Sequence, residues 1–155
     1  MLRDRVGALL RAEEGHEFRH QWRDWDQISK YAPLAVVAAE DQRFPQHRGF
    51  DFKQIDKALA DRERGRRVRG ASTISQQVAK NVFLWHGRRW VRKSREAILT
   101  PAVELVWPKR RSLEVYLNVA EVDEGVFGVQ AAAQHHFGVD ARDLTALQAA
   151  RLAAV

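Results

Sequence analysis

Apolar positions in this chain recur mostly at the spacing of an α-helix. Ile74, Val78 and Val82 stand four residues apart, which places them on one helical face. The alternation of apolar and polar residues that marks a half-buried strand is scarce. The pattern predicts helices over residues 33–40, 52–62, 74–82, 90–107, 112–118, 129–136 and 144–155. We therefore expect a mainly α fold.

Local signals add detail to three of these helices. Ser72 or Thr73 suits the N-cap of the third helix, and Gln76 stands where a capping-box partner is expected. Pro101 falls inside the fourth helix and should kink it. Residues 34–39 form an unbroken apolar run, so the first helix is expected to be buried.

The composition is that of one folded domain. The chain has 155 residues, of which 45% are hydrophobic and 30% charged, which argues against extensive disorder. It contains no cysteine, so disulfides, thiolate metal sites and a cysteine nucleophile are excluded. No apolar run approaches the roughly 20 residues of a membrane-spanning helix. The net charge of +6 favours an anionic partner, which leaves nucleic acid, a membrane surface and a phosphorylated substrate open.

Glu40 is the first candidate for chemistry. It ends an apolar helix, where desolvation and the negative end of the helix dipole both raise the pKa of a carboxyl group. A raised pKa suits a general acid or base, although a lone glutamate here is more often a solvated helix end. Asp41, Phe44, His47 and Gly49 follow in one short loop. A cluster of these residue types is seldom needed only to stabilise a loop. The cluster therefore favours a catalytic role for Glu40 over a solvated helix end.

A second polar group lies on the helix that follows Ser72. On a helix, Gln76 lies above Lys80 and Gln77 above Asn81, so amides and a cation share one face. Such a face suits sugar hydroxyls and phosphate oxygens. A solvated surface opposite the apolar stripe is an equally good alternative on chemistry alone.

A third group is cationic. Residues 88–95 hold five Lys or Arg in eight positions, and Glu96 follows them. Local ion pairs with Glu96 would contribute only about 0.2–1 kcal/mol each and would use few of these charges. The excess of positive charge indicates binding of an external anion such as a diphosphate. Glu96 would then be an acidic residue next to that anion.

In order and spacing, these segments resemble the motifs of the peptidoglycan glycosyltransferases. The matching segments are Glu-Asp-x-x-Phe-x-x-His-x-Gly at residues 40–49, Gly-x-Ser-Thr-Ile-x-Gln-Gln-x-x-Lys-Asn at residues 70–81, Arg-Lys-x-x-Glu at residues 92–96, and residues 109–118 and 125–133. The resemblance runs from about residue 18 to residue 155. No transpeptidase region is present, so the chain is most similar to the monofunctional biosynthetic transglycosylases.

The resemblance implies a role for each matching residue. Glu40 is expected to be the catalytic base that takes the proton from the 4-hydroxyl of the acceptor sugar. Glu96 is expected to be the second catalytic acid, which assists departure of the donor diphosphate directly or through Mg²⁺ or Mn²⁺. The residues expected to bind substrate are Asp41, Phe44, His47, Ser72, Thr73, Gln76, Gln77, Lys80, Asn81, Arg88, Arg92 and Arg95. No organic cofactor is expected, and no metal ligand is assigned.

The resemblance also implies a reaction and a setting. The reaction is polymerisation of lipid II into β-1,4-linked glycan by inverting transfer from a polyprenyl-diphosphate donor. The fold is a lysozyme-like helical core with a smaller mobile lobe beside the cleft. Expected partners are lipid II, the growing glycan strand, the membrane surface and other proteins of cell-wall synthesis or division, but no nucleic acid. The expected location is the periplasmic or outer face of the bacterial inner membrane, without the family's usual anchor helix in this chain.

The domain boundaries follow from the same resemblance. Residues 1–17 are expected to form an N-terminal extension, and residues 18–155 the glycosyltransferase domain. The apolar residues 152–155 carry no polar stop, which predicts a domain cut inside its last helix. Asp123 and Glu124 stand where the family usually has a glycine or an aromatic residue, which affects the local loop.

Three other functions remain open. A muramidase-like hydrolase also needs a buried glutamate, but its sugar leaving group has no use for the cations of residues 88–95. A nucleic-acid-binding module would use residues 62–69 and 88–95 and would show a steep salt dependence. That module leaves Glu40 and Gln76 unexplained. A non-catalytic domain of the same fold would keep the motifs without turnover.

Overall fold

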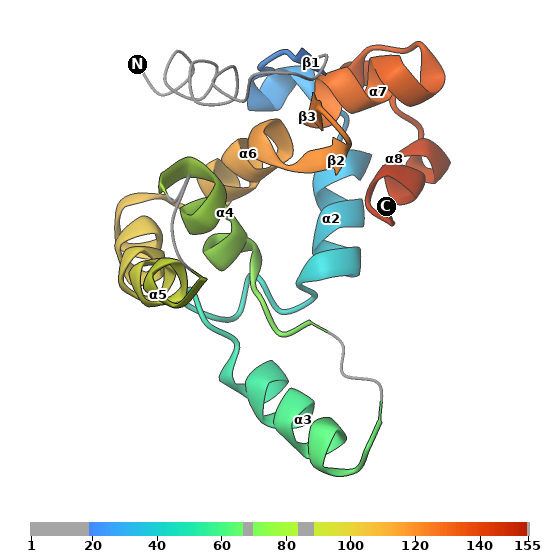
Figure 1. Cartoon of the computed structure of the whole chain (residues 1–155). Coiled ribbons are helices and arrows are strands. Elements are labelled where there is room, and N and C mark those ends of the chain that lie inside the picture. Colours follow the sequence, from blue (N-terminus) through green and yellow to red (C-terminus); the bar gives the residue numbers. More distant parts are fainter. Residues whose placement is uncertain (1–18, 67–69, 84–88, 155) are drawn as a thin grey trace.

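The computed structural model describes residues 19–66, 70–83 and 89–154, with side chains throughout except at residues 89–94. In chain order the elements are β1 (Arg19–His20), η1 (Trp25–Gln27), α2 (Tyr31–Glu40), α3 (Phe52–Glu63), α4 (Ile74–Phe83), α5 (Arg89–Val106), α6 (Lys109–Val119), β2 (Glu121–Asp123), β3 (Val126–Phe127), α7 (Val129–Phe137), η2 (Ala141–Asp143) and α8 (Ala146–Leu152). Helices dominate these ranges (Figure 1), so the mainly α prediction is confirmed.

The predicted helices correspond to α2 through α8, and the largest difference is in α8. This helix begins at Ala146 because Thr145 is its N-cap, with Thr145 Oγ1 accepting from the Gln148 backbone N–H at 3.3 Å. Pro101 lies inside α5, and the kink expected there stays a prediction. Among the described residues, no helix combines the length and the apolar character needed to cross a membrane.

The start of α4 confirms the predicted cap. The Thr73 backbone N–H donates to Gln76 Oε1 at 2.9 Å, and the Gln76 backbone N–H donates to Thr73 Oγ1 at 3.2 Å. This reciprocal pair is a capping box, which fixes both side chains at the beginning of the helix. Ile74, Val78 and Val82 are all buried, so the predicted apolar stripe faces the core.

The core consists of two main clusters that share α6. The first lies between α4, α5 and α6 and includes Phe44, Val78, Val103 and Val115. The second joins α2, α6, α7 and α8, with Leu117 of α6 among its buried residues (Figure 1). Because α6 packs in both clusters, it sets the position of α2 relative to α4.

A small sheet lies beside α7. Its order is β1-β3-β2, with β1 parallel to β3 and β2 antiparallel to β3. Gly128 connects β3 to α7 with a φ of 82°. A Cβ atom at this position would lie 2.7 Å from the backbone oxygen of Asn118. Only glycine therefore fits where the hairpin passes the end of α6.

Helix α3 projects from the rest of the chain (Figure 1). None of its residues is buried, and Phe52 and Leu59 are exposed apolar side chains. Asp51 caps the helix, because its Oδ1 accepts from the Gln54 backbone N–H at 3.1 Å. Helix α3 is thus the smaller lobe that the resemblance implies, and its mobility stays a prediction.

The predicted burial of α2 is wrong for much of its surface. Ala32 is its one buried residue, whereas Leu34 is 64% exposed and Ala38 is exposed as well. The apolar run continues around the whole helix, so α2 has no polar side to turn outward. It packs against α6 and α8, and its remaining apolar surface stays open.

Candidate active site

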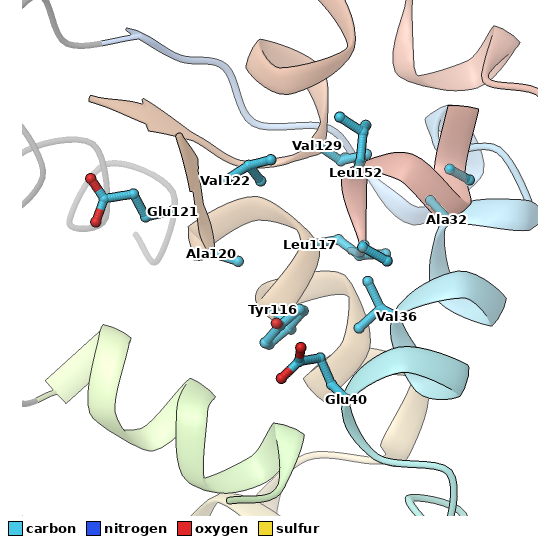
Figure 2. Close-up of a pocket in the computed structure, with 12 residues that line it drawn as sticks. Ala32, Val36, Glu40, Tyr116, Leu117, Ala120, Glu121, Val122, Val129 and Leu152 are labelled. Atoms are coloured by element: carbon cyan, nitrogen blue, oxygen red, sulfur yellow. The ribbon is translucent and has the colours of Figure 1, made fainter. Parts of the chain in front are cut away.

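Glu40 is the last residue of α2, and its side chain is exposed. The Nε2 of Gln77 on α4 donates a 2.9 Å hydrogen bond to Glu40 Oε2. The hydroxyl of Tyr116 on α6 donates to Gln77 Oε1 over a longer distance of 3.5 Å. Figure 2 shows the side chains of Tyr116 and Glu40 pointing toward each other. This relay from α6 through α4 holds one carboxylate oxygen of Glu40, and thereby the orientation of the other.

Tyr116 was not among the residues singled out from the sequence. Burial raises the pKa of Tyr116 far above its ordinary value, and the negative charge of Glu40 raises it further. The phenol therefore stays protonated at physiological pH and keeps its hydrogen for Gln77. The only sequence feature that could have identified Tyr116 is its position in segment 109–118, which matches a family motif.

The desolvation that the sequence predicted for Glu40 is not found, because α2 ends at an open groove. The groove runs between α2, α6 and α8 (Figure 2). Val36, Leu117 and Leu152 contribute to its apolar lining, and Glu40 borders it. Water therefore reaches the Glu40 carboxylate. Its orientation comes from the Gln77 hydrogen bond rather than from burial.

Glu40 also borders a cavity on the side of α3. This cavity has a volume of about 150 Å³, and its lining includes Gln42, Gln54, Lys57 and Asp61. Gln54 and Lys57 belong to α3. Glu40 therefore stands between the helical core and the smaller lobe, where an elongated substrate can pass it.

A separate polar cavity lies beyond Gln77. It has a volume of about 260 Å³ and is lined by Ser72, Gln76, Gln77, Lys80 and Glu96. Typical ligand pockets measure roughly 300–1,000 Å³, so this one suits a compact polar group such as a phosphate. Gln76, Gln77 and Lys80, which the sequence placed on one helical face, thus share a single cavity, whereas Asn81 is not among its described lining residues.

Glu96 contributes the acid of this polar cavity. Its side chain is buried, and Gln76 Nε2 donates to its Oε1 at 3.3 Å. Mg²⁺ and Mn²⁺ prefer oxygen ligands, and Mg²⁺ often binds through one or two carboxylates together with substrate phosphates. Glu96 is the carboxylate among the described lining residues, so the donor set fits a cation that also binds phosphate oxygens.

Asp41 and His47 form a buried pair between the end of α2 and the start of α4. His47 Nε2 lies 2.8 Å from Asp41 Oδ2, which also accepts from the Ile74 backbone N–H at 3.1 Å. The ring of Phe44 meets the His47 ring edge to face, with centroids 6.0 Å apart. None of Asp41, Phe44 and His47 is among the described residues that line the groove or the two cavities. They act on the site by holding α2 and α4 together.

Of the remaining residues predicted to bind substrate, only some line the polar cavity. Ser72 lines the polar cavity, whereas Thr73 is buried and its hydroxyl donates to the backbone oxygen of Gly49. Asn81 is half-buried and Arg95 is exposed. Neither is among the described residues that line the polar cavity. Arg88 and the side chain of Arg92 lie outside the described part of the chain.

No sequence pattern singled out Glu104, a largely buried acid behind α4. It accepts hydrogen bonds from Ser75 Oγ on α4 and from Lys109 Nζ on α6. Lys109 Nζ also lies 4.2 Å from the centroid of the Phe44 ring. Glu104 itself belongs to α5. This network joins α4 and α5, which carry the lining residues Gln76, Gln77, Lys80 and Glu96 of the polar cavity, to α6.

Comparisons with known proteins identify the family of this chain. The profile of the family described as Transglycosylase matches residues 7–155. The protein of Xanthomonas campestris pv. campestris (strain B100) is 58% identical over 97% of this chain and 63% of its own length. That of Xanthomonas oryzae pv. oryzae (strain KACC10331 / KXO85) is 63% identical over 97% of this chain and 63% of its own length. That of Chromohalobacter salexigens is 61% identical over 88% of this chain and 58% of its own length.

All three relatives carry the name biosynthetic peptidoglycan transglycosylase. This chain spans less than two thirds of the length of each. The profile match nevertheless covers all the motifs between residues 40 and 133. The lysozyme-like helical core expected from those motifs is that of a transglycosylase domain. The chain therefore belongs to the transglycosylase family, the peptidoglycan glycosyltransferases that its motifs resemble.

Proposed function

We propose that this chain is the catalytic domain of a monofunctional peptidoglycan glycosyltransferase, which polymerises lipid II into β-1,4-linked glycan strands. One observation carries the proposal. Gln77 holds the exposed carboxylate of Glu40 and also lines the polar cavity that contains Lys80 and Glu96. This arrangement sets a proton acceptor beside a site for a phosphorylated leaving group. Glycosyl transfer from a diphosphate donor needs both.

Glu40 acts as the general base in this proposal. One of its carboxylate oxygens takes the proton from the 4-hydroxyl of the acceptor sugar as that hydroxyl oxygen bonds to the anomeric carbon of the donor. The bond between the anomeric carbon and the diphosphate oxygen breaks, and attack from the opposite face inverts the configuration. The proton then passes from Glu40 to water, which reaches this exposed side chain.

The polar cavity receives the diphosphate. Negative charge grows on the diphosphate as it leaves, so a cation fixed beside it stabilises the transition state more than the bound substrate. Lys80 lines this cavity. We assign Arg88, Arg92 and Arg95 to the same anion, since they lie on the chain just before Glu96.

A divalent cation, Mg²⁺ or Mn²⁺, supplies further neutralisation of the leaving group when bound. Glu96 is the residue that would hold it, together with phosphate oxygens of the donor. Gln76 keeps Glu96 oriented toward the cavity through the 3.3 Å hydrogen bond to Oε1. Without a cation, Glu96 would assist departure of the diphosphate directly.

The proposed donor carries a polyprenyl chain, so the reaction takes place at a membrane surface. We place the domain on the periplasmic or outer face of the bacterial inner membrane. The net charge of +6 favours contact with anionic headgroups. Proteins of cell-wall synthesis or division stay expected partners.

Incubation of the purified chain with fluorescent lipid II, detergent and Mg²⁺ or Mn²⁺ tests the proposal. Gel electrophoresis should show glycan strands that a muramidase then degrades, and EDTA should slow their formation. A muramidase-like hydrolase would instead release soluble fragments from finished peptidoglycan. A non-catalytic domain would do neither. Either of these two results from protein that circular dichroism shows to be folded would overturn the proposal.

A further inference from the structure

A cluster of possible metal ligands lies where the β2–β3 hairpin meets α7. Asp123 is the last residue of β2, and His135 and His136 lie in the last turn of α7. One ligand atom from each residue lies within 4.8 Å of the others. None of the three lines the groove or the cavities beside Glu40. We propose that Asp123, His135 and His136 form a surface site for a divalent transition-metal ion, with Zn²⁺ as its best match.

The distances are close to those around a bound ion. The Nε2 atoms of His135 and His136 each lie 3.8 Å from Asp123 Oδ2. Zinc bonds of about 2.0–2.1 Å at a tetrahedral angle separate two ligand atoms by about 3.3 Å. Each imidazole must therefore come about 0.5 Å closer to the carboxylate. All three side chains are exposed, so small rotations achieve this.

The types of ligand select the metal. Two imidazoles and one carboxylate suit Zn²⁺, Ni²⁺ or Cu²⁺, whereas Mg²⁺ and Mn²⁺ prefer oxygen ligands throughout. A site with three protein ligands leaves the fourth position of zinc to water. The cluster therefore differs in chemistry from the Glu96 cavity, which offers a carboxylate and room for phosphate oxygens.

The Asp123 carboxylate is already turned toward the histidines. The Glu124 backbone N–H donates to Asp123 Oδ1 at 2.8 Å, and Oδ2 is the oxygen that faces both imidazoles. A hydrogen bond to the second oxygen of a ligating carboxylate is the usual way in which proteins orient such a ligand. Asp123 is also one of the two positions at which the sequence departs from the family pattern. The family motifs therefore do not imply this site.

Arg19 competes with the metal for one histidine. Its Nη1 lies 3.3 Å from His135 Nδ1, which must then accept the hydrogen bond. A neutral imidazole that binds metal through Nε2 carries its proton on Nδ1 and cannot accept there. Metal binding therefore displaces the Arg19 guanidinium from His135. Removing that guanidinium should tighten the site.

Occupancy of the site would fix the β2–β3 hairpin to the end of α7. Val122 lies next to Asp123 in β2 and contributes to the groove that Glu40 borders. An ion that binds only the folded chain stabilises it by mass action, so the melting temperature should rise with the Zn²⁺ concentration.

The test is a Zn²⁺ titration of tag-free protein, by competition with a chromogenic chelator, alongside thermal melting. We expect one Zn²⁺ per chain with a dissociation constant on the order of micromolar, and a higher melting temperature with Zn²⁺ but not with Mg²⁺. His135→Ala, His136→Ala and Asp123→Asn should each weaken binding by at least about tenfold. Glu124→Gln is the matched control and should bind as the wild type does, whereas Arg19→Gln should bind more tightly.

Each ligand variant must melt like the wild type without metal, which is expected because these side chains are exposed. Zn²⁺ binding of unchanged strength in all three ligand variants would assign the ion to other residues and overturn the proposal. So would a wild type that binds Zn²⁺ only at millimolar concentration.

Discussion

The side-chain amide of Gln77 donates a 2.9 Å hydrogen bond to the carboxylate of Glu40. The two residues come from α4 and α2, whose relative position depends on packing against α6. Tyr116 on α6 contacts the same amide. An exposed carboxylate would otherwise sample several orientations, so in the proposed reaction this contact directs the carboxylate of Glu40 toward the acceptor hydroxyl.

Replacing Gln77 with alanine should therefore slow catalysis more than it weakens substrate binding. A hydrogen bond to a charged group contributes about 1.5–3 kcal/mol, which corresponds to about a ten- to hundredfold lower kcat. Steady-state kinetics with labelled lipid II would measure it, with a smaller change expected in KM, because Gln77 also lines the polar cavity. Gln134→Ala is the control, because Gln134 is an exposed glutamine on another helix. An equal loss in both variants, or a loss that follows the melting temperature, would contradict a positioning role.

Tyr116 should make the domain less stable in alkali. Its pKa is raised in the folded chain by burial and by Glu40. Above the ordinary tyrosine pKa of about 10, the unfolded chain releases this phenolic proton while the folded chain retains it. The free energy of unfolding must then fall as the pH rises.

Urea unfolding of the wild type and Tyr116→Phe between about pH 9 and pH 11 measures this effect, because the variant lacks the phenol. We expect a steeper fall in the wild type. Only the pH slopes are compared, so a constant difference in stability between the two proteins does not matter. Identical slopes would show that Tyr116 titrates alike in both states.

The buried pair of Asp41 and His47 should matter more to stability than any exposed ion pair. Replacing His47 with alanine removes a buried hydrogen-bond partner of the Asp41 carboxylate, which costs about 1.5–3 kcal/mol. Denaturant unfolding would show the loss. Asp26→Asn removes an exposed ion pair with Arg110 and should cost less than about 1 kcal/mol. Similar losses in the two variants would mean that the buried pair has no special role.

Periodicity and capping predicted α4 well because both depend on neighbours in the sequence. Thr73 and Gln76, which are three positions apart in the sequence, form the capping box of α4. Ile74 and Val78 are buried, as their helical spacing predicts. The same helical spacing predicted that Gln76 and Lys80 share a face, and the two line one cavity. Local patterns therefore located the polar wall of the site.

Burial and distant contacts could not be predicted in the same way. The apolar run before Glu40 indicated a buried carboxylate, but how much of a helix is covered depends on which helices pack against it. Tyr116 meets Gln77 only because α4 and α6 cross in the fold. Glu104 is likewise explained only by its contacts with Ser75 and Lys109. No local spacing reports such contacts.

Replacement of Glu40 with glutamine tests the central claim most directly. Glutamine has nearly the same shape and can still accept from the Gln77 amide, but it cannot take up a proton at neutral pH. Because Glu40 is exposed, the variant should change the free energy of unfolding by no more than about 0.5 kcal/mol. Glu121→Gln is the matched control, since Glu121 is a second exposed glutamate that borders the groove.

The decisive measurement is the rate of glycan formation from labelled lipid II by the wild type, Glu40→Gln and Glu121→Gln, each with its melting temperature. We predict that Glu40→Gln is slower by at least about a hundredfold at an unchanged melting temperature. Glu121→Gln should keep the wild-type rate. Long glycan strands made by Glu40→Gln at the wild-type rate would contradict the assignment of Glu40 as the base.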